Sequence, residues 1–126
     1  MSRDPLAPDA VPGSDPFGVT VNVEHRAGAV VLRVGGELDM LTTPKLQASI
    51  ADALLDQPAV LVLDLAKVTF LASSAMAAIV EAHQAGADRT AVRVVAGGRE
   101  TARPLEVAGL DGYLSVHPTL DAALAT

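Results

Sequence analysis

The sequence predicts an α/β domain in which about four α-helices pack on a mixed β-sheet of four or five strands. Residues 19–24 and 29–34 are strand-like and are joined by a turn that contains Gly28, which predicts an antiparallel hairpin. Residues 59–65 form a nearly continuous apolar run, typical of a strand that is buried on both faces. After the hairpin, helical and strand-like segments alternate, so the later strands are expected to be parallel.

The chain of 126 residues is expected to hold one folded domain. Half of its residues are hydrophobic but only 2% are aromatic, so we expect a core of Val, Leu, Ile and Ala. Residues 1–16 contain four prolines and have no hydrophobic period, which predicts a disordered N-terminal arm. Residues 17–126 are then the folded domain.

The composition argues against several classes of function. The chain has no cysteine, which excludes disulfides, thiolate metal sites and catalytic thiols. His25, His83 and His117 lie far apart on different elements, so no metal or other cofactor is expected. The net charge of −6 and the absence of a basic run argue against a nucleic-acid partner. No apolar stretch is long enough to insert into a membrane and no secretory signal is visible, so we expect a cytoplasmic protein.

The first long helix is predicted to begin at Thr43 as the N-cap, with Pro44 at the first helical position. Apolar residues at helical spacing then predict an amphipathic helix that ends before Pro58. The preceding residues 35–42 are expected to form a loop.

The second long helix is predicted to begin at Ser73 or Ser74 and to end at Gly86, the expected C′ residue. It carries a stripe of small side chains that permits close approach to the sheet, made of Ala75, Ala78, Ala82 and Ala85. The remaining predicted elements are a strand at 91–96, a short helix at 101–108 that Gly109 closes, an edge strand at 113–116 and a final helix at 118–124.

The loops that follow the parallel strands are expected to gather at one edge of the sheet. These loops comprise residues 35–43, 67–74 and 97–100. The glycine pairs at 35–36 and 97–98 fit neither the dinucleotide fingerprint nor the P-loop, so turns are favoured over phosphate sites. Glu37 and Asp39 are interpreted either as a carboxylate pair or as solvated charges at a loop and a helix start.

Ser73 and Ser74 admit three interpretations. In the first, one serine caps the helix through its side-chain oxygen. In the second, one serine is a phosphoacceptor, because a phosphate is stabilised at a helix N-terminus. In the third, one serine is a nucleophile. No Gly-x-Ser-x-Gly motif surrounds them, and His83 follows on the same helix at the wrong distance for a base. No catalytic residue and no enzymatic activity are therefore predicted.

Residues 31–39 (VLRVGGELD) and 61–76 (LVLDLAKVTFLASSAM) resemble the STAS domain of anti-anti-sigma factors, also called anti-sigma factor antagonists. The resemblance runs from about residue 19 to residue 124. It implies a STAS-like mixed sheet and a regulator that binds an anti-sigma factor of the serine-kinase type, thereby releasing a sigma factor. It also implies that the kinase phosphorylates a serine at the start of the second long helix and that a phosphatase reverses the reaction.

The family acceptor lies in a motif like Asp-Ser-Ser-Gly, whose second serine matches Ser74, with Ser73 as the alternative acceptor. Ala72 stands in place of the motif Asp, and Ala75 in place of the motif Gly. The expected partner-binding residues are Glu37, Asp39, Met40, Thr42, Ala72, Ser73, Ser74, Ala75 and Met76. The alternative that the resemblance leaves open is a STAS accessory subunit of a membrane lipid-transport complex.

Overall fold

The computed structural model describes residues 18–125, so the predicted N-terminal arm lies outside the described residues. This part of the chain forms an α/β domain. Its elements in order are β1 (Val19–Arg26), β2 (Ala29–Leu38), α1 (Thr43–Leu54), β3 (Val60–Leu71), α2 (Ser73–Gly86), β4 (Ala91–Val95), α3 (Ala102–Val107), the 3-10 helix η1 (Leu110–Gly112), β5 (Ser115–His117) and α4 (Leu120–Ala125).

The strands form one mixed sheet in the order β1-β2-β3-β4-β5. β1 and β2 pair antiparallel through the predicted hairpin, and β2, β3, β4 and β5 run parallel to one another. The sheet therefore confirms the fold class predicted from the alternation of strand-like and helical segments.

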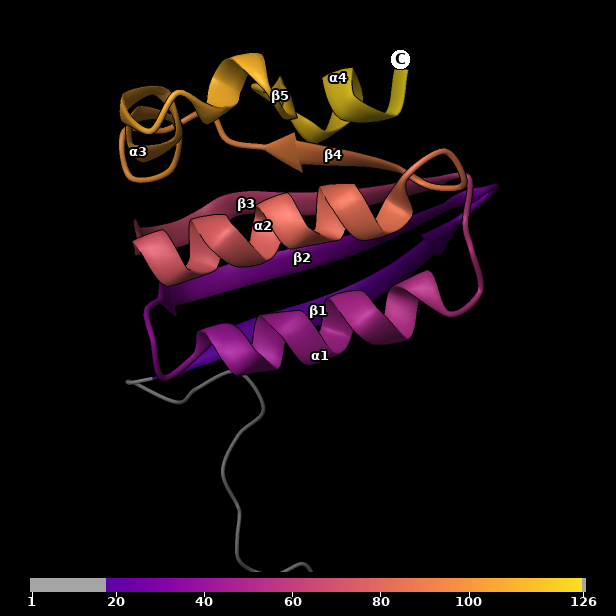
Figure 1. Cartoon of the computed structure of the whole chain (residues 1–126), viewed down its shortest axis with the longest axis horizontal. Helices are drawn as coiled ribbons and strands as arrows, with labels where there is room; N and C mark the ends of the chain where they lie inside the picture. Colours follow the sequence, from indigo (N-terminus) through magenta and orange to yellow (C-terminus); the bar gives the residue numbers. More distant parts are fainter. Residues whose placement is uncertain (1–17, 126) are drawn as a thin grey trace, which may run out of the picture.

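Helices cover the two faces of the sheet unequally. α1 and α2 lie side by side along one face (Figure 1). The main core lies between these helices and the sheet, and its fully buried side chains include Leu32, Leu46, Leu63 and Ile79. On the other face a smaller cluster of Val31, Val62 and Val95 packs against Ala123 of α4. Much of that second face has no helix over it among the described elements.

The first residues of two predicted loops, 35–43 and 67–74, belong to strands in the structure. β2 continues through Gly35 and Gly36 to Leu38, and β3 continues to Leu71, because the two strands stay paired up to Leu38 opposite Leu71. The sequence pattern concealed this, since only one face of β3 is buried after Leu65. The pairing also shifts register twice in this region, which interrupts any regular alternation.

The start of α1 differs from the prediction by one residue, whereas α2 begins at Ser73, one of its two predicted first residues. Thr43 is the first residue of α1 and Thr42 precedes it, and neither forms a side-chain cap bond. Ala72 is the N-cap of α2, so neither serine caps this helix and the capping interpretation is wrong. An alanine has no oxygen to accept an N–H group, and the two serines follow it inside the first turn.

α2 ends at Gly86 as predicted, but Gly86 is not its C′ residue. Gly86 is the last residue of the helix, and the positive φ of 48° belongs to Ala87 instead. Gly86 is small for a packing reason: a Cβ atom there would lie 3.2 Å from Cγ2 of Val92. Near the C-terminus, η1 was not predicted, whereas Gly109 does close α3 with a φ of 74°.

Candidate functional site

The candidate site lies where β2 and β3 end beside each other. The amide of Ala72 donates to the carbonyl of Leu38 at 2.8 Å, so the segment that enters α2 begins next to the one that enters α1. This contact brings residues 39–42 and the start of α2 to a common edge, as predicted. The third predicted loop, residues 97–100, does not reach this edge. β4 stops pairing at Val95 opposite Asp64, whereas β3 continues to Leu71.

The turn before α1 is organised by the Asp39 carboxylate. Its Oδ1 accepts the amide protons of Leu41 at 2.9 Å and Thr42 at 3.0 Å, and lies 3.2 Å from the Thr42 hydroxyl. The backbone hydrogen bond from Thr42, reinforced by the Thr42 hydroxyl and the Leu41 amide, lowers the pKa of Asp39. The Asp39 carboxylate therefore forms its hydrogen bonds within its own turn. Its position there is explained without a carboxylate pair with Glu37.

Two threonine hydroxyls connect this turn to the neighbouring backbone. The Thr42 hydroxyl donates to the carbonyl of Glu37 at 2.7 Å and accepts the Asp39 amide at 3.0 Å. The Thr43 hydroxyl donates to the carbonyl of Asp39 at 2.6 Å. Both threonine side chains are buried, so these bonds hold the turn in one conformation.

Ser74 joins this network from α2. Its Oγ lies 3.3 Å from Oγ1 of Thr43. A hydroxyl has one proton, and that of Thr43 is used on the Asp39 carbonyl, so Ser74 is the donor in this pair. The bond orients the Ser74 side chain toward the start of α1. Ser73 is more exposed than Ser74.

The first turn of α2 has a positive electrostatic character. The helix spans 14 residues, and its first amides have no partner four residues earlier in the chain. Ser73 and Ser74 occupy its first two positions, and no acidic residue lies in this turn. A negative group attached to either serine is therefore close to the positive end of the helix dipole.

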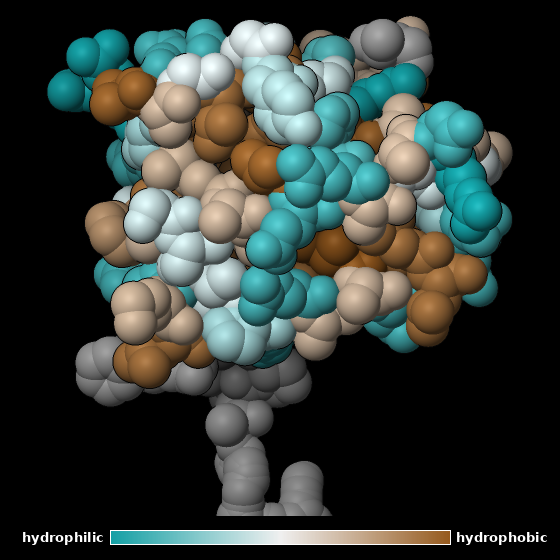
Figure 2. Space-filling view, viewed as in Figure 1, coloured by the Kyte–Doolittle hydropathy of each residue, from teal (hydrophilic) through white to brown (hydrophobic). Residues whose placement is uncertain are grey.

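Exposed apolar side chains surround this edge. Met40 is 78% exposed, Leu41 is 89% exposed and Phe70 is 51% exposed. Figure 2 shows hydrophobic surface at its lower left corner, where the segment between β2 and α1 lies. Exposed apolar side chains close together are a feature of protein-binding surfaces. Leu41 and Phe70 are not among the partner-binding residues that the sequence predicts, although two adjacent large apolar residues in a turn, Met40 and Leu41, are a usable signal.

The other expected partner-binding residues divide by exposure. Glu37 is exposed, and Ala72 and Met76 are half-buried, with Met76 packed against the core. Ala75 is fully buried, because it is part of the stripe by which α2 approaches the sheet. The methyl group of Ala75 thus faces the core rather than the candidate site.

The glycine pairs are explained by close packing. A Cβ at Gly36 would lie 2.7 Å from the carbonyl oxygen of Gly18, and Gly36 has a φ of 97°. A Cβ at Gly97 would lie 2.7 Å from the carbonyl oxygen of Pro118. Backbone from another segment thus occupies the space above each glycine, which supports a structural role.

Nothing in the described part of the chain forms a metal centre, since no three His, Asp or Glu side chains in residues 18–125 come together as ligands. His83 packs its ring edge-to-face on Tyr113, with centroids 5.0 Å apart. None of the described helices is long and apolar enough to cross a membrane.

The fold and the serine-bearing helix start define a STAS-type domain. The STAS domain family matches residues 20–123, and the chain belongs to this family. It is 35% identical over 111 residues to the anti-sigma-F factor antagonist RsfB of Mycobacterium tuberculosis, a match that covers 88% of this chain and 91% of RsfB.

Solved structures give the same result. A crystal structure of an anti-sigma factor antagonist from Mycobacterium paratuberculosis is 38% identical, with a TM-score of 0.84 over 89% of this chain and 96% of the other. SpoIIAA, a Bacillus cell fate determinant solved in its phosphorylated form, shares the fold at 16% identity, with a TM-score of 0.62 over 84% of this chain and 97% of SpoIIAA.

Proposed function

We propose that this STAS protein is an anti-sigma factor antagonist that binds an anti-sigma factor and thereby releases a sigma factor. The observation that carries the proposal is its similarity, over nearly the whole length of both chains, to two antagonists that are 35% and 38% identical. The protein then acts by binding in the cytoplasm, where sigma factors work, and has no enzymatic activity of its own. Nothing in the comparisons favours the lipid-transport alternative.

The proposed docking surface is the edge formed by residues 37–42 and 72–76 together with Phe70. Its centre is apolar and exposed at Met40 and Leu41, and the hydrogen bonds of Asp39 hold the backbone of this turn in place. A surface that is ordered before binding loses less conformational entropy when the partner docks. This supports the edge as the contact area.

Ser74 is the proposed phosphoacceptor, and Ser73 is the alternative. Phosphorylation replaces the Ser74 proton that is donated to Thr43 and adds about −1.5 to −2 charges at the start of α2. The helix N-terminus stabilises this charge within the domain, whereas a partner docked over the edge must bury it. The expected consequence is release of the partner with little change in the fold. The proposed kinase is the anti-sigma factor itself, opposed by a phosphatase.

The test combines binding and phosphorylation with the purified anti-sigma factor. We expect Ser74→Asp to weaken binding at least about tenfold, measured by calorimetry. Ser49→Asp is the matched control and should bind like the wild type, because Ser49 is a half-buried residue of α1 that lies away from the docking edge. Incubation with ATP should add one phosphate by intact mass, and Ser74→Ala should abolish this.

The outcomes separate the two parts of the proposal. Binding without phosphate transfer supports the antagonist function and contradicts its regulation by phosphorylation. Phosphate transfer that persists in Ser74→Ala and disappears in Ser73→Ala moves the acceptor to Ser73. An absence of binding by the wild-type protein contradicts the antagonist function.

A further inference from the structure

We propose that the open face of the sheet carries a second binding site, for a small hydroxylated anion such as a sugar phosphate or a hydroxy acid. The site is a cavity of about 300 Å³ over β1, β2 and β3. It is separate from the proposed docking edge, and its function does not depend on that of Ser74. Its volume is at the lower end of the range for small-molecule pockets.

The register of the sheet brings the lining side chains together. Asn22 pairs with Arg33, and Arg33 pairs with Asp64 on the third strand. One step further along, Thr20 pairs with Gly35, and Gly35 pairs with Lys67. Directly paired residues project to the same face of a sheet. Polar side chains from three strands therefore line one cavity on the face opposite α1 and α2.

Gly35 forms the floor of the cavity. A Cβ at this position would lie 3.0 Å from Oγ1 of Thr20 and 3.5 Å from Cβ of Lys67. A larger residue would thus displace the surrounding polar groups and fill the space between them. The glycine keeps the middle of the cavity open.

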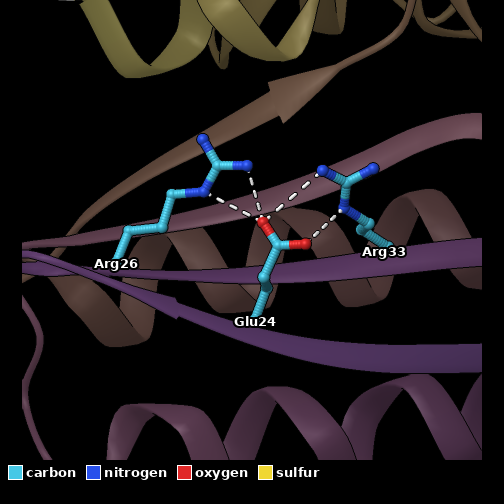
Figure 3. A network of polar contacts seen from close by, with 3 residues as sticks. All are labelled: Glu24, Arg26 and Arg33. Carbon is cyan, nitrogen blue, oxygen red and sulfur yellow. Dashed lines mark hydrogen bonds and ion pairs between the residues drawn. The ribbon is translucent and has the colours of Figure 1, made fainter.

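The positive side of the cavity comes from Arg33 and Lys67. Glu24 fixes Arg33, with its Oε2 3.0 Å from Nε of Arg33, and it also binds Arg26 at 2.7 Å (Figure 3). The hydrogen bond from Arg26, followed by the contacts of Arg33, lowers the pKa of Glu24. Lys67 forms no ion pair within residues 18–125, so its ammonium group is available to an anion.

Asp64 supplies the opposite pole of the cavity. It is only 7% exposed, and its Oδ1 accepts the amide proton of Ala66 at 3.0 Å, where β3 shifts register against β2. Within residues 18–125 no other group donates to this carboxylate. A buried carboxylate oxygen needs a donor, and an O–H group of a ligand provides one.

The two poles define the chemistry of the ligand. Among the residues that line the cavity, two cations (Arg33 and Lys67) face one acid (Asp64), a local excess of +1 in a chain whose net charge is −6. Outside the cavity, Glu24 binds both Arg33 and Arg26. An anion is attracted to the basic side, but Asp64 disfavours a ligand without a hydrogen-bond donor. A phosphate or carboxylate that also carries hydroxyl groups satisfies both sides, and Asn22 and Thr20 add further polar contacts.

The test uses glucose 6-phosphate as the probe in an amide NMR titration at constant ionic strength. We expect saturable shifts at Thr20, Asn22, Ala66 and Lys67, with no shift at Ser74. Lys67→Gln should weaken binding about tenfold, because it removes a charge-assisted hydrogen bond. Asp64→Asn should also weaken it while retaining an oxygen for the Ala66 amide.

Arg89→Gln is the matched control, because Arg89 is an exposed cation in the turn between α2 and β4. It should bind the probe like the wild type. An equal loss in Arg89→Gln overturns the proposal, as do shifts spread over the whole surface or an absence of saturable shifts. Binding of glucose or of inorganic phosphate as tight as that of glucose 6-phosphate overturns the two-pole assignment. Lys67 is exposed, so its variant tests the site even where Asp64→Asn destabilises the fold.

Discussion

The two long helices of this STAS domain begin side by side but in contrasting ways. α1 follows a turn in which Asp39, Thr42 and Thr43 satisfy one another and the adjacent backbone through hydrogen bonds. α2 follows Ala72, which has no polar side chain, and has no side-chain cap bond. α1 also lacks a side-chain cap bond, but the amides of Thr42 and Thr43 at its start have acceptors on Asp39, whereas the start of α2 can still receive a negative group. A rigid turn beside an uncapped helix start suits a surface whose charge is to be switched.

The Thr43 hydroxyl is the link between the two helix starts, and its removal should have the largest effect on stability. Thr43→Val keeps the shape but leaves the Ser74 hydroxyl without its partner and removes one of the hydrogen bonds to the Asp39 carbonyl, which still accepts the Thr43 amide at 2.9 Å. We expect a loss of about 2 kcal/mol in the free energy of unfolding, measured by urea denaturation. Thr43→Ser should restore most of this loss. Equal destabilisation by both variants would show that the methyl group, not the hydroxyl, is responsible.

A side chain that caps α2 should make its start resemble that of α1 and should stabilise the domain. Ala72 has extended backbone angles, φ −80° and ψ 164°, which suit an N-cap residue. Ala72→Asp is therefore expected to stabilise the domain by about 1 kcal/mol. Ala77→Asp, at an exposed position inside α2, is the control and should give no gain. A thermal shift of the same sign and size in both variants would rule out a capping effect.

The Asp39 turn should give a pH-dependent contribution to stability. Its hydrogen bonds lower the folded-state pKa below the ordinary value of 3.8, so the folded state favours the carboxylate. The contribution is complete above the unfolded-state pKa and disappears as the pH falls through the lower folded-state value. Wild type should exceed Asp39→Asn in melting temperature at neutral pH, and the difference should shrink below pH 3.8. A difference that is constant across this range would contradict an ionic role.

The smallest effect on stability is expected at Leu41, which is 89% exposed. Leu41→Ser should change the free energy of unfolding by less than about 0.5 kcal/mol, because the side chain buries little surface. Its affinity for the anti-sigma factor should nevertheless fall, since apolar contacts at the centre of an interface contribute most. Leu55→Ser, at an equally apolar and exposed position beyond the C-terminus of α1, should leave the affinity unchanged. Equal affinities of wild type and Leu41→Ser would remove this residue from the docking surface.

The strand and helix order followed from local patterns that are strong in this chain. The nearly continuous apolar run at 59–65 and the alternation after the hairpin identified the parallel sheet, because strands buried on both faces are built mostly of apolar residues, with Asp64 as the exception here. The extension of β2 and β3 was missed for the opposite reason. Beyond Leu65 the pair is open to solvent on one side, and its two register shifts disrupt the period of two on which strand prediction relies.

The sequence by itself determined the class of fold, the family resemblance and the position of the serine pair, because each of these is encoded over short stretches of chain. Only the tertiary structure decided that Ala72 rather than a serine occupies the N-cap, since a cap is defined by backbone angles. It also brought the Ser74 hydroxyl to 3.3 Å from that of Thr43 and placed Asn22, Arg33 and Asp64 around one cavity. These contacts join residues far apart in the chain, and they depend on a strand register that no local pattern specifies.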